Sequence, residues 1–484
     1  MRIPTNDLLI KHLNKAKMVK YLDIKVCHNK CNNLIFKGDT IAAREDEDMI
    51  ITARAVANGY GIASMSNLSE CYKHEPTHSS QSSPCSHNTH LQLEHNIDKI
   101  VEQAIEHATS LSCIQADCDG RGCGVNLAEV DVERGHVKDL ASDHDNNNLY
   151  EVIEHVVSLL RSRLRDDVRI EVNLSYTESE NGLVSSEGTD VRECIATTTI
   201  DIRLSMRYHG SIIQVSKKMG GRGGIEVLKR KSMDDALDEM ITTMNHLLHA
   251  RQFSVLESGR RFKVVLDNEV GGTLARLIGN MLEADEFNPK IFSSLHVQQG
   301  LEVVDDPTLP NGYGSFVWDD EGVRGRRKVL ISSDTLNLLH TRLTASTPAD
   351  GYSTPGNARG VYGIPKPTVS NVYIKPMDWY VDEIIDDARE CIVMKGVERA
   401  SADTARGIVE IKPVIAYHIK DKEIMHAIRG ISLQDSIRNI LKGIDAISRV
   451  AILKPYRDEQ YVFRIGEGSP YIRLESARCV CSVM

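Results

Sequence analysis

The sequence predicts an α+β protein made of two domains, and three observations support this. First, 484 residues exceed what one hydrophobic core usually holds, so more than one domain is expected. Second, amphipathic helical segments and strand-like segments share the first half of the chain, which is typical of sheets covered by helices. Third, the chain becomes richer in short strands and turns past Phe262. We therefore predict an N-terminal α+β domain over residues 1–225 and a C-terminal β-rich domain over residues 226–484.

The N-terminal domain begins with a strand pair and a helix. Residues 49–56 alternate enough for a strand, and the dipeptide Asn58-Gly59 predicts a turn into a second strand. A helix is expected over 96–110, where apolar residues recur on one face.

Residues 71–95 lie between these elements and are rich in Ser, His and Asn. This segment contains Cys71, His74, His78, Cys85, His87, His90 and His95. Clusters of Cys and His can bind a transition metal. The alternative is a solvated loop inserted after a strand, which the low apolar content and the run 79–83 (SSQSS) favour.

From about residue 150 to residue 250, the chain is predicted to form a sheet covered by helices. A helix is expected over 150–164, followed by strands over 168–176 and 195–208. Another helix follows over 232–250, with Ser232 as its N-cap and two acidic residues in its first turn.

The C-terminal domain is predicted from short apolar runs separated by turns. The strand candidates are 328–332, 369–374, 408–419 and 461–465, and the helix candidates are 382–391 and 433–447. A further helix is expected over 274–284, where Leu274, Leu277, Ile278 and Met281 form an apolar face typical of any buried amphipathic helix.

Composition indicates a soluble globular protein and excludes several classes of partner. The net charge of −10, from 58 basic and 68 acidic residues, argues against a broad nucleic-acid-binding face. The sequence contains no run of 18 apolar residues, so no membrane span is predicted. Residues 1–18 lack the apolar core of a signal peptide. Eleven cysteines are too few for a disulfide scaffold and indicate reduced thiols. We therefore expect a cytoplasmic location. The C-terminal residues 481–484 (CSVM) match a prenylation signal, although four-residue matches arise by chance.

The most informative segment is 264–287, VVLDNEVGGTLARLIGNMLEADEF. It resembles the TldD/PmbA (TldD/TldE) metallopeptidase family, whose catalytic members place His-Glu-x-x-x-His before a Leu-Glu-x-Asp ending. Residues 282–285 match that ending. On this alignment the two histidine positions hold Ala275 and Asn280, and the glutamate position holds Arg276.

Other segments follow the family's order over roughly residues 180–475. They are 186–190 (SEGTD), 221–224 (GRGG), 303–307 (VVDDP), 319–322 (DDEG), 326–331 (RRKVLI), 353–359 (STPGNAR) and 370–373 (SNVY). Each is weak alone, but their shared order strengthens the resemblance. Pro355 departs from the family's Thr-Gly-Asn-x-Arg pattern.

The resemblance implies that this chain has lost its zinc site. A Cys-Gly-Lys-Asp-Gly-Gln segment supplies a third ligand in catalytic members, and here Pro455 replaces the cysteine while Asp458 and Gln460 are retained. Zinc needs imidazole, thiolate or carboxylate donors, and hydrolysis needs a base beside the bound water. We therefore expect no catalytic residue, no metal and no other cofactor at these positions.

Three functions remain open. The first is a catalytically silent subunit of a peptide-processing assembly, as a homo-oligomer or as a heterodimer with a ligand-complete TldD-like chain. The second is a stand-alone protein that binds a peptide or a partner. The third is an active metallopeptidase with relocated ligands, from segment 71–95 or from His340 and His418.

The residues retained from the family indicate where a peptide substrate would bind. Asp319, Asp320 and Glu321 could hold a cation or the amino terminus of a peptide, the alternative being a turn with solvated acids. Asn357 and Asn371 could hydrogen-bond an extended peptide backbone, the alternative being ordinary turn chemistry.

Overall fold

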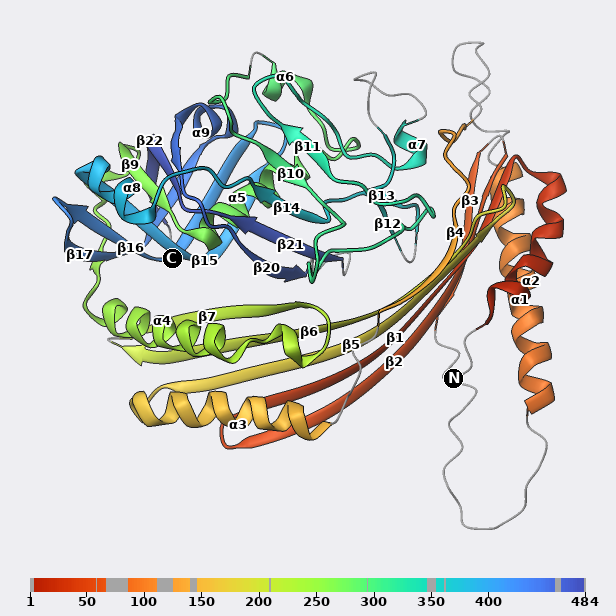
Figure 1. Cartoon of the computed structure of the whole chain (residues 1–484), viewed down its shortest axis with the longest axis horizontal. Helices are drawn as coiled ribbons and strands as arrows, with labels where there is room; N and C mark the ends of the chain where they lie inside the picture. Colours follow the sequence, from red (N-terminus) through yellow and green to blue (C-terminus); the bar gives the residue numbers. More distant parts are fainter. Residues whose placement is uncertain are drawn as a thin grey trace.

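The structure, a computed structural model, describes residues 4–57, 59–66, 86–110, 125–139, 146–208, 210–293, 295–345, 354–360, 363–457 and 463–482. It combines many strands with several helices, which confirms the predicted α+β class. A long curved sheet runs along one side of a β-rich C-terminal body, and Figure 1 shows both parts.

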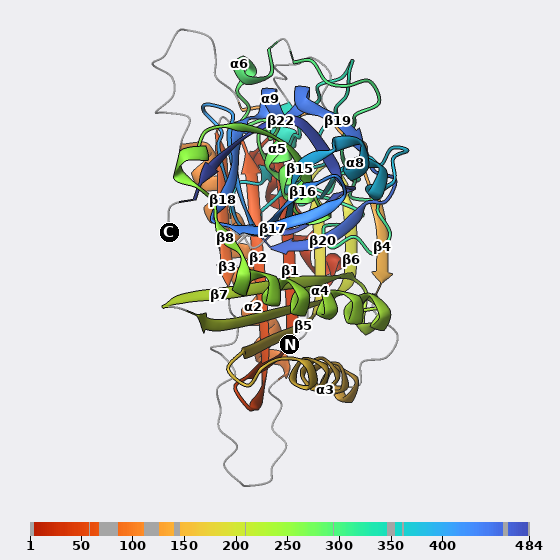
Figure 2. The same ribbon diagram turned by 90° about the vertical axis from the view of Figure 1, so that its left-hand side faces the viewer.

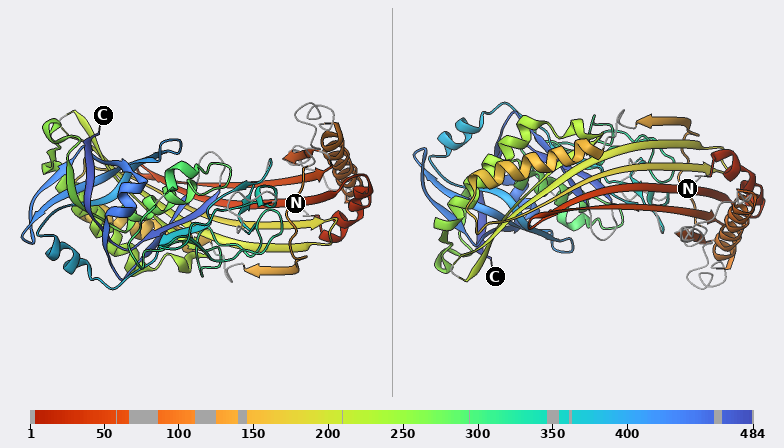
Figure 3. Two further views of the ribbon diagram at one scale, coloured as in Figure 1. Left: turned by 90° about the horizontal axis from the view of Figure 1, so that it is seen from above. Right: turned by 90° about the horizontal axis from the view of Figure 1, so that it is seen from below.

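The curved sheet has seven strands in the order β3-β2-β1-β5-β6-β4, with β7 also paired to β6. The strands are β1 Tyr21–Lys37, β2 Thr40–Val56, β3 Tyr60–Ser66, β4 Arg134–Asp139, β5 Arg169–Ser185, β6 Asp190–Tyr208 and β7 Ser211–Arg222. All neighbours are antiparallel except β4 and β6. Strands of up to 19 residues extend well past the C-terminal body, as Figure 3 shows.

Helices pack at the two ends of this sheet. At the far end lie α1 Asn6–His12, the short η1 Leu13–Met18 and α2 Ser86–Ser110, and near the C-terminal body lie α3 Asn146–Arg163 and α4 Arg230–His249. Helix α2 lies so close to β3 that a Cβ on Gly61 would come within 2.0 Å of the Ala104 carbonyl oxygen. Helix α4 lies between the sheet and the C-terminal body in Figure 2.

The C-terminal body holds three sheets. The largest has the order β15-β9-β22-β18-β16-β17-β8, and because β15 also pairs with β16, five of its strands close into a ring. The second sheet has the order β11-β10-β14-β21-β20, and the third pairs β12 with β13. The strands are β8 Arg251–Gln252, β9 Arg261–Leu266, β10 Val303–Asp305, β11 Lys328–Ile331, β12 Ala358–Arg359, β13 Lys366–Pro367, β14 Asn371–Ile374, β15 Glu390–Asp403, β16 Ile408–Lys420, β17 Glu423–Arg429, β18 Ile431–Ser436, β19 Ile444–Ile447, β20 Ile452–Arg457, β21 Arg464–Ser469 and β22 Ile472–Cys481.

Helix α5 Asn268–Asn280 lies inside this body and is buried on all sides from Val270 to Gly279. Asp267 caps it by accepting hydrogen bonds from the backbone N–H groups of Glu269 and Val270, at 3.0 and 2.8 Å. Small residues let the helix approach β21, since a Cβ on Gly272 would lie 3.1 Å from the Gly468 nitrogen. The other short helices are η4 Ile225–Val227, η5 Val255–Glu257, α6 Pro289–Phe292, α7 Arg342–Ala345, α8 Val381–Ala388 and α9 Ile437–Gly443.

Four predicted helix limits are wrong. The helix predicted over 96–110 is α2, which begins ten residues earlier, at Ser86. Of the predicted helix 433–447 only α9 is helical, because the flanking residues pair as β18 and β19 with β22. Ser232 is not an N-cap, since α4 starts at Arg230 after Lys229. The predicted site helix 274–284 is instead α5, which begins earlier and ends at Asn280.

The domain boundary near residue 225 stays a prediction. The strands of the curved sheet end at Arg222, and the first strand of the C-terminal sheets starts at Arg251. One hydrophobic cluster nevertheless joins Ile202 of the curved sheet, Leu237 of α4 and Val393 of β15. Within the described ranges, no helix is both long and apolar enough to cross a membrane.

Candidate functional site

The positions aligned with the family's site lie on α5 and on β20, two elements that pack against each other. Ala275, Arg276 and Asn280 all lie on α5, and Pro455 lies on β20 opposite Gly466 of β21. The Arg276 guanidinium lies over the ring of Tyr456, 3.9 Å from its centroid. This contact joins two residues that are 180 positions apart in the sequence.

The carboxylate of Glu467 on β21 forms ion pairs with two cations of this region, Arg276 and Lys454. Its oxygens lie 2.6 Å from Nε of Arg276 and 3.1 Å from Nζ of Lys454, and the Thr273 hydroxyl donates to it at 3.0 Å. Glu467 is 2 % exposed. Burial opposes its ionisation, but Lys454 and Arg276 outweigh it and hold the pKa of Glu467 below its usual value.

Alternating charges continue from Lys454 towards the curved sheet. Lys454 lies 3.5 Å from Glu269, which also pairs with Lys217 of β7. Lys217 in turn contacts Glu239 of α4 at 2.8 Å, and Lys395 of β15 contacts the same carboxylate at 3.1 Å. Ion pairs therefore connect β20 and α5 with the sheet and with α4.

These side chains do not fit a zinc ion. Ala275 is fully buried and has no donor atom, and the Arg276 cation is already held by Glu467. In the part of the chain that the structure describes, no three His, Cys, Asp or Glu side chains are arranged to hold a metal. The predicted Cys/His segment falls largely outside the described residues, because 71–85 are not described and 86–95 belong to the backbone of α2. Asp458, Gln460, Val483 and Met484 also lie outside the described residues.

The acidic residues 319–321 lie in a tight turn between the bridged residues Trp318 and Arg324. Oδ1 of Asp319 accepts from the N–H groups of Glu321 and Val323, both at 2.9 Å, and Oδ2 accepts from Ala358 at 3.0 Å. Asp320 forms an ion pair with Lys25 of β1 and accepts from the Gly360 N–H at 2.7 Å. These contacts fix the turn against the curved sheet.

Glu321 is the most perturbed acid of the turn. It is 5 % exposed, and its Oε2 accepts from the backbone N–H of Arg342 at 2.6 Å. Burial and the neighbouring Asp319 carboxylate raise the pKa of Glu321 to about 8, against the opposing effect of Arg54 and Arg342. In the folded chain Glu321 is therefore mostly protonated at neutral pH.

This pKa predicts a loss of stability as the pH rises. Because the folded pKa of Glu321 exceeds the ordinary value of 4.5, its contribution is present below that value and is lost as the pH rises towards 8. Glu321→Gln keeps an acceptor for Arg342 but cannot ionise. We expect its urea midpoint to fall less than that of the wild type between pH 5 and 8, in unfolding followed by circular dichroism. Parallel pH profiles for the two proteins would contradict this assignment.

The two asparagines predicted to bind a peptide backbone are fully buried. Asn357 donates to Asp305 at 2.7 Å and accepts from Lys328. Asn371 donates to the Asp306 carbonyl and to the Ser315 hydroxyl, each at 2.8 Å, and accepts from the Gly314 N–H. Their amides thus hold the chain's own loops, and a direct contact with a peptide stays a prediction.

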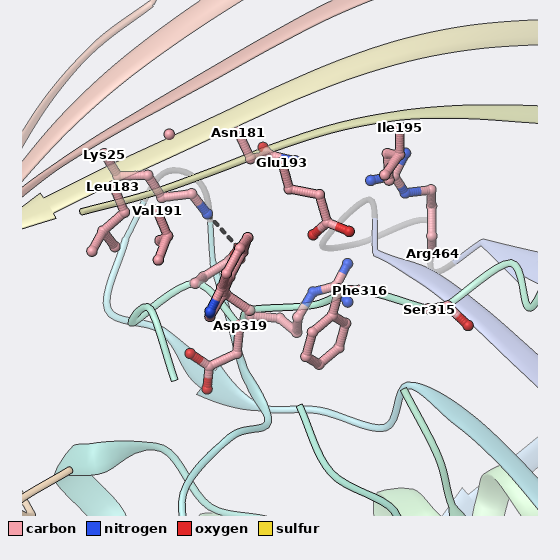
Figure 4. A pocket seen from close by; sticks show the side chains of 14 residues that line it. Lys25, Asn181, Leu183, Val191, Glu193, Ile195, Ser315, Phe316, Asp319 and Arg464 are labelled. Atoms are coloured by element: carbon pink, nitrogen blue, oxygen red, sulfur yellow. Dashed lines mark ion pairs between the residues drawn. The ribbon is translucent and has the colours of Figure 1, made fainter. Parts of the chain in front are cut away.

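A pocket lies between the curved sheet and the turn that holds Asp319 and Asp320, and Figure 4 shows it. It encloses about 510 Å³ of empty space, open solvent at its mouth included. Six of its charged and aromatic side chains were not predicted as site residues: Lys25, Glu193, Phe316, Trp318, Arg359 and Arg464. Of these, only Arg359 lies within a family-like motif. The six come from five separate segments of the sequence, so no local pattern could group them.

Similarity to known proteins agrees with the fold. Residues 258–480 match the family model described as PmbA/TldA metallopeptidase C-terminal domain. A "Metalloprotease" of Methanothermobacter thermautotrophicus is 31% identical over 329 residues, 64% of this chain and 69% of that protein. A "Metalloprotease TldD homolog" of Buchnera aphidicola is 26% identical over 379 residues, 70% of this chain and 72% of that protein.

One solved structure shares this fold over nearly the whole chain. The TldE of Thermococcus kodakarensis aligns with a TM-score of 0.73 at 13% identity, covering 98% of this chain and 99% of that one. Fold and sequence together define a metallopeptidase-like protein. The chain belongs to the TldD/PmbA family.

Proposed function

We propose that this chain is a catalytically silent subunit of a peptide-processing assembly. The observation that carries the proposal is the ion pair between Arg276 and Glu467, at 2.6 Å, in the position that the family alignment gives to the catalytic glutamate. A guanidinium does not deprotonate, so it cannot accept a proton from water. A second cation, Lys454, lies 3.1 Å from the same carboxylate, so a zinc dication would meet two positive charges there.

The proposed partner is a ligand-complete TldD-like chain, with a homo-oligomer as the alternative. The similar proteins include chains named as metalloproteases, TldD homologues and TldE. This chain shares its overall fold with the solved TldE structure, and its α5 and β20 are in contact through Arg276 and Tyr456. We further propose a cytoplasmic location, and the net charge of −10 supports a partner other than nucleic acid.

A stand-alone peptide-binding protein is the second candidate, and the pocket beside Asp320 favours it. For the third candidate, relocated ligands, the structure offers less support. His340 is buried and its Nδ1 lies 3.1 Å from the Thr344 hydroxyl, while His418 lies on β16 beside Glu390. Neither belongs to a group of three metal-binding side chains within the described ranges.

We expect chain purified without added metal to contain far less than one zinc per molecule and to leave unfolded peptides intact. The reason is that the side chains at 275, 276, 280 and 455 include no zinc donor of ordinary strength. Elemental analysis and a peptide-cleavage assay measure both properties. Near-stoichiometric zinc would contradict this expectation, unless deleting residues 71–95 removed it. In that case the Cys/His segment would be the metal site.

A further inference from the structure

Two arginines from distant strands line the pocket between the curved sheet and the 315–320 loop. Arg359 lies at the end of β12, and Arg464 is the first residue of β21. Figure 4 shows Arg464 beside Glu193 and Ile195 of β6, with Phe316 between Arg464 and Asp319. The pocket thus joins strands of the N-terminal sheet with the C-terminal body.

Neither guanidinium has an ion pair within the described ranges. Arg464 donates one hydrogen bond, to the Ser179 hydroxyl at 3.1 Å. Arg359 lies over the ring of Phe316, 5.0 Å from its centroid, and 5.9 Å from that of Phe463. Burial and the nearby Arg359 lower the pKa of Arg464. Two cations that repel each other in a partly buried pocket favour an anion between them.

The acids that line the pocket already have partners. Asp320 pairs with Lys25, and the three backbone N–H groups of Glu321, Val323 and Ala358 surround Asp319. Glu193 lies 2.9 Å from Nη1 of Arg222 and accepts from the Val317 N–H at 3.2 Å. None of these acids forms an ion pair with Arg359 or Arg464 within the described ranges, although the charge of Arg359 also helps to lower the pKa of Asp320.

We propose that Arg359 and Arg464 form a subsite for a carboxylate group of a bound peptide. Arginine presents its N–H groups in a planar fork that matches the two oxygens of a carboxylate. Phe316 and Trp318 offer an apolar wall for the side chain next to that carboxylate. The enclosed space is small, so it suits a carboxylate group and the atoms next to it rather than a folded domain.

The subsite rests on the proposed peptide-handling function and specifies its substrate class. The carboxylate can be the free C-terminus of the peptide or an acidic side chain, because both present the same two oxygens. Three fluorescent peptides of one apolar sequence distinguish these sources. One has a free C-terminus, one has an amidated C-terminus and a single internal Glu, and one is amidated and carries no acid.

Fluorescence anisotropy with the isolated full-length chain is the test. We expect one or both carboxylate peptides to bind at least about tenfold more tightly than the peptide without acid, as for a charge-assisted hydrogen bond. Arg359→Gln and Arg464→Gln should each remove most of that difference, and Arg464→Lys should retain part of it. Arg251→Gln is the matched control, since Arg251 is exposed on β8 and is not among the residues that line the pocket.

The outcomes separate the subsite from the proposed function. Equal binding of all three peptides, or no binding of any, overturns the carboxylate subsite. Loss of binding that Arg251→Gln also produces overturns it too. The proposed function is tested by a separate measurement, and it fails if this chain forms no complex with a ligand-complete relative.

Discussion

Replacing Glu467 with glutamine should destabilise the protein by about 3–5 kcal/mol, the usual cost of leaving a buried charge without its partner. Arg276 and Lys454 both depend on this carboxylate, at 2.6 and 3.1 Å. The glutamine would place an N–H donor against cations that need an acceptor. We expect a clearly lower urea midpoint and weaker protection of α5 amides in hydrogen exchange.

Glu475→Gln is the matched control for this variant. Glu475 lies on β22, the next strand along the chain, its side chain is 59% exposed, and it pairs with Lys263 at 3.1 Å. Solvent screens such a pair, so a change of at most about 1 kcal/mol is expected. Equal small effects of the two variants would show that Arg276 does not depend on Glu467, and would remove the main support for a silent site.

Asp23→Asn should lower the stability of the protein by a comparable amount, at the turn that holds residues 319–323. Asp23 and Arg54 are each 1 % exposed, and two hydrogen bonds of 2.8 and 2.7 Å join them. Arg54 also donates to the carbonyl oxygen of Asp320 at 2.6 Å. Neutralising Asp23 leaves a buried guanidinium without its anion, which costs about 3–5 kcal/mol. The 319–323 turn should also become less protected in hydrogen exchange, because Arg54 holds it.

Asp46→Asn provides the comparison, since Asp46 lies on the same strand as Arg54 and pairs with the exposed Arg44. Its effect on the urea midpoint should be small because both side chains are in water. If Asp23→Asn left the midpoint and the exchange of the 319–323 amides unchanged, the pair would not anchor the turn.

Local patterns predicted the existence of most elements better than their limits. Alternation and turn residues indicated a strand over 49–56, which is the end of β2, but nothing in them predicted the full 17 residues of that strand. The segment 433–447 carries apolar residues that fit a helix and a strand equally well. Pairing of its ends with β22 decided the outcome, and such pairing depends on residues distant in the sequence.

Part of the candidate site could likewise be predicted from the sequence, and part could not. The family-like motifs predicted that Arg276 and Pro455 belong to one region, and in the structure Arg276 lies over the ring of Tyr456, the residue after Pro455. The signal for the start of α5 was present in Asp267, an N-cap residue, and was missed. Glu467 could not be foreseen, because no motif marks it and its role follows from a partner 191 residues away.

The central claim is that this chain supports catalysis by another chain and performs none itself. The most direct measurement mixes tagged chain with a ligand-complete relative and follows co-purification and cleavage of an unfolded peptide. We expect a stable complex whose cleavage is abolished when the two motif histidines of the relative are replaced, and no cleavage by this chain alone. Metal-dependent cleavage by this chain alone, or a strictly monomeric chain that binds no ligand-complete relative, would contradict the account.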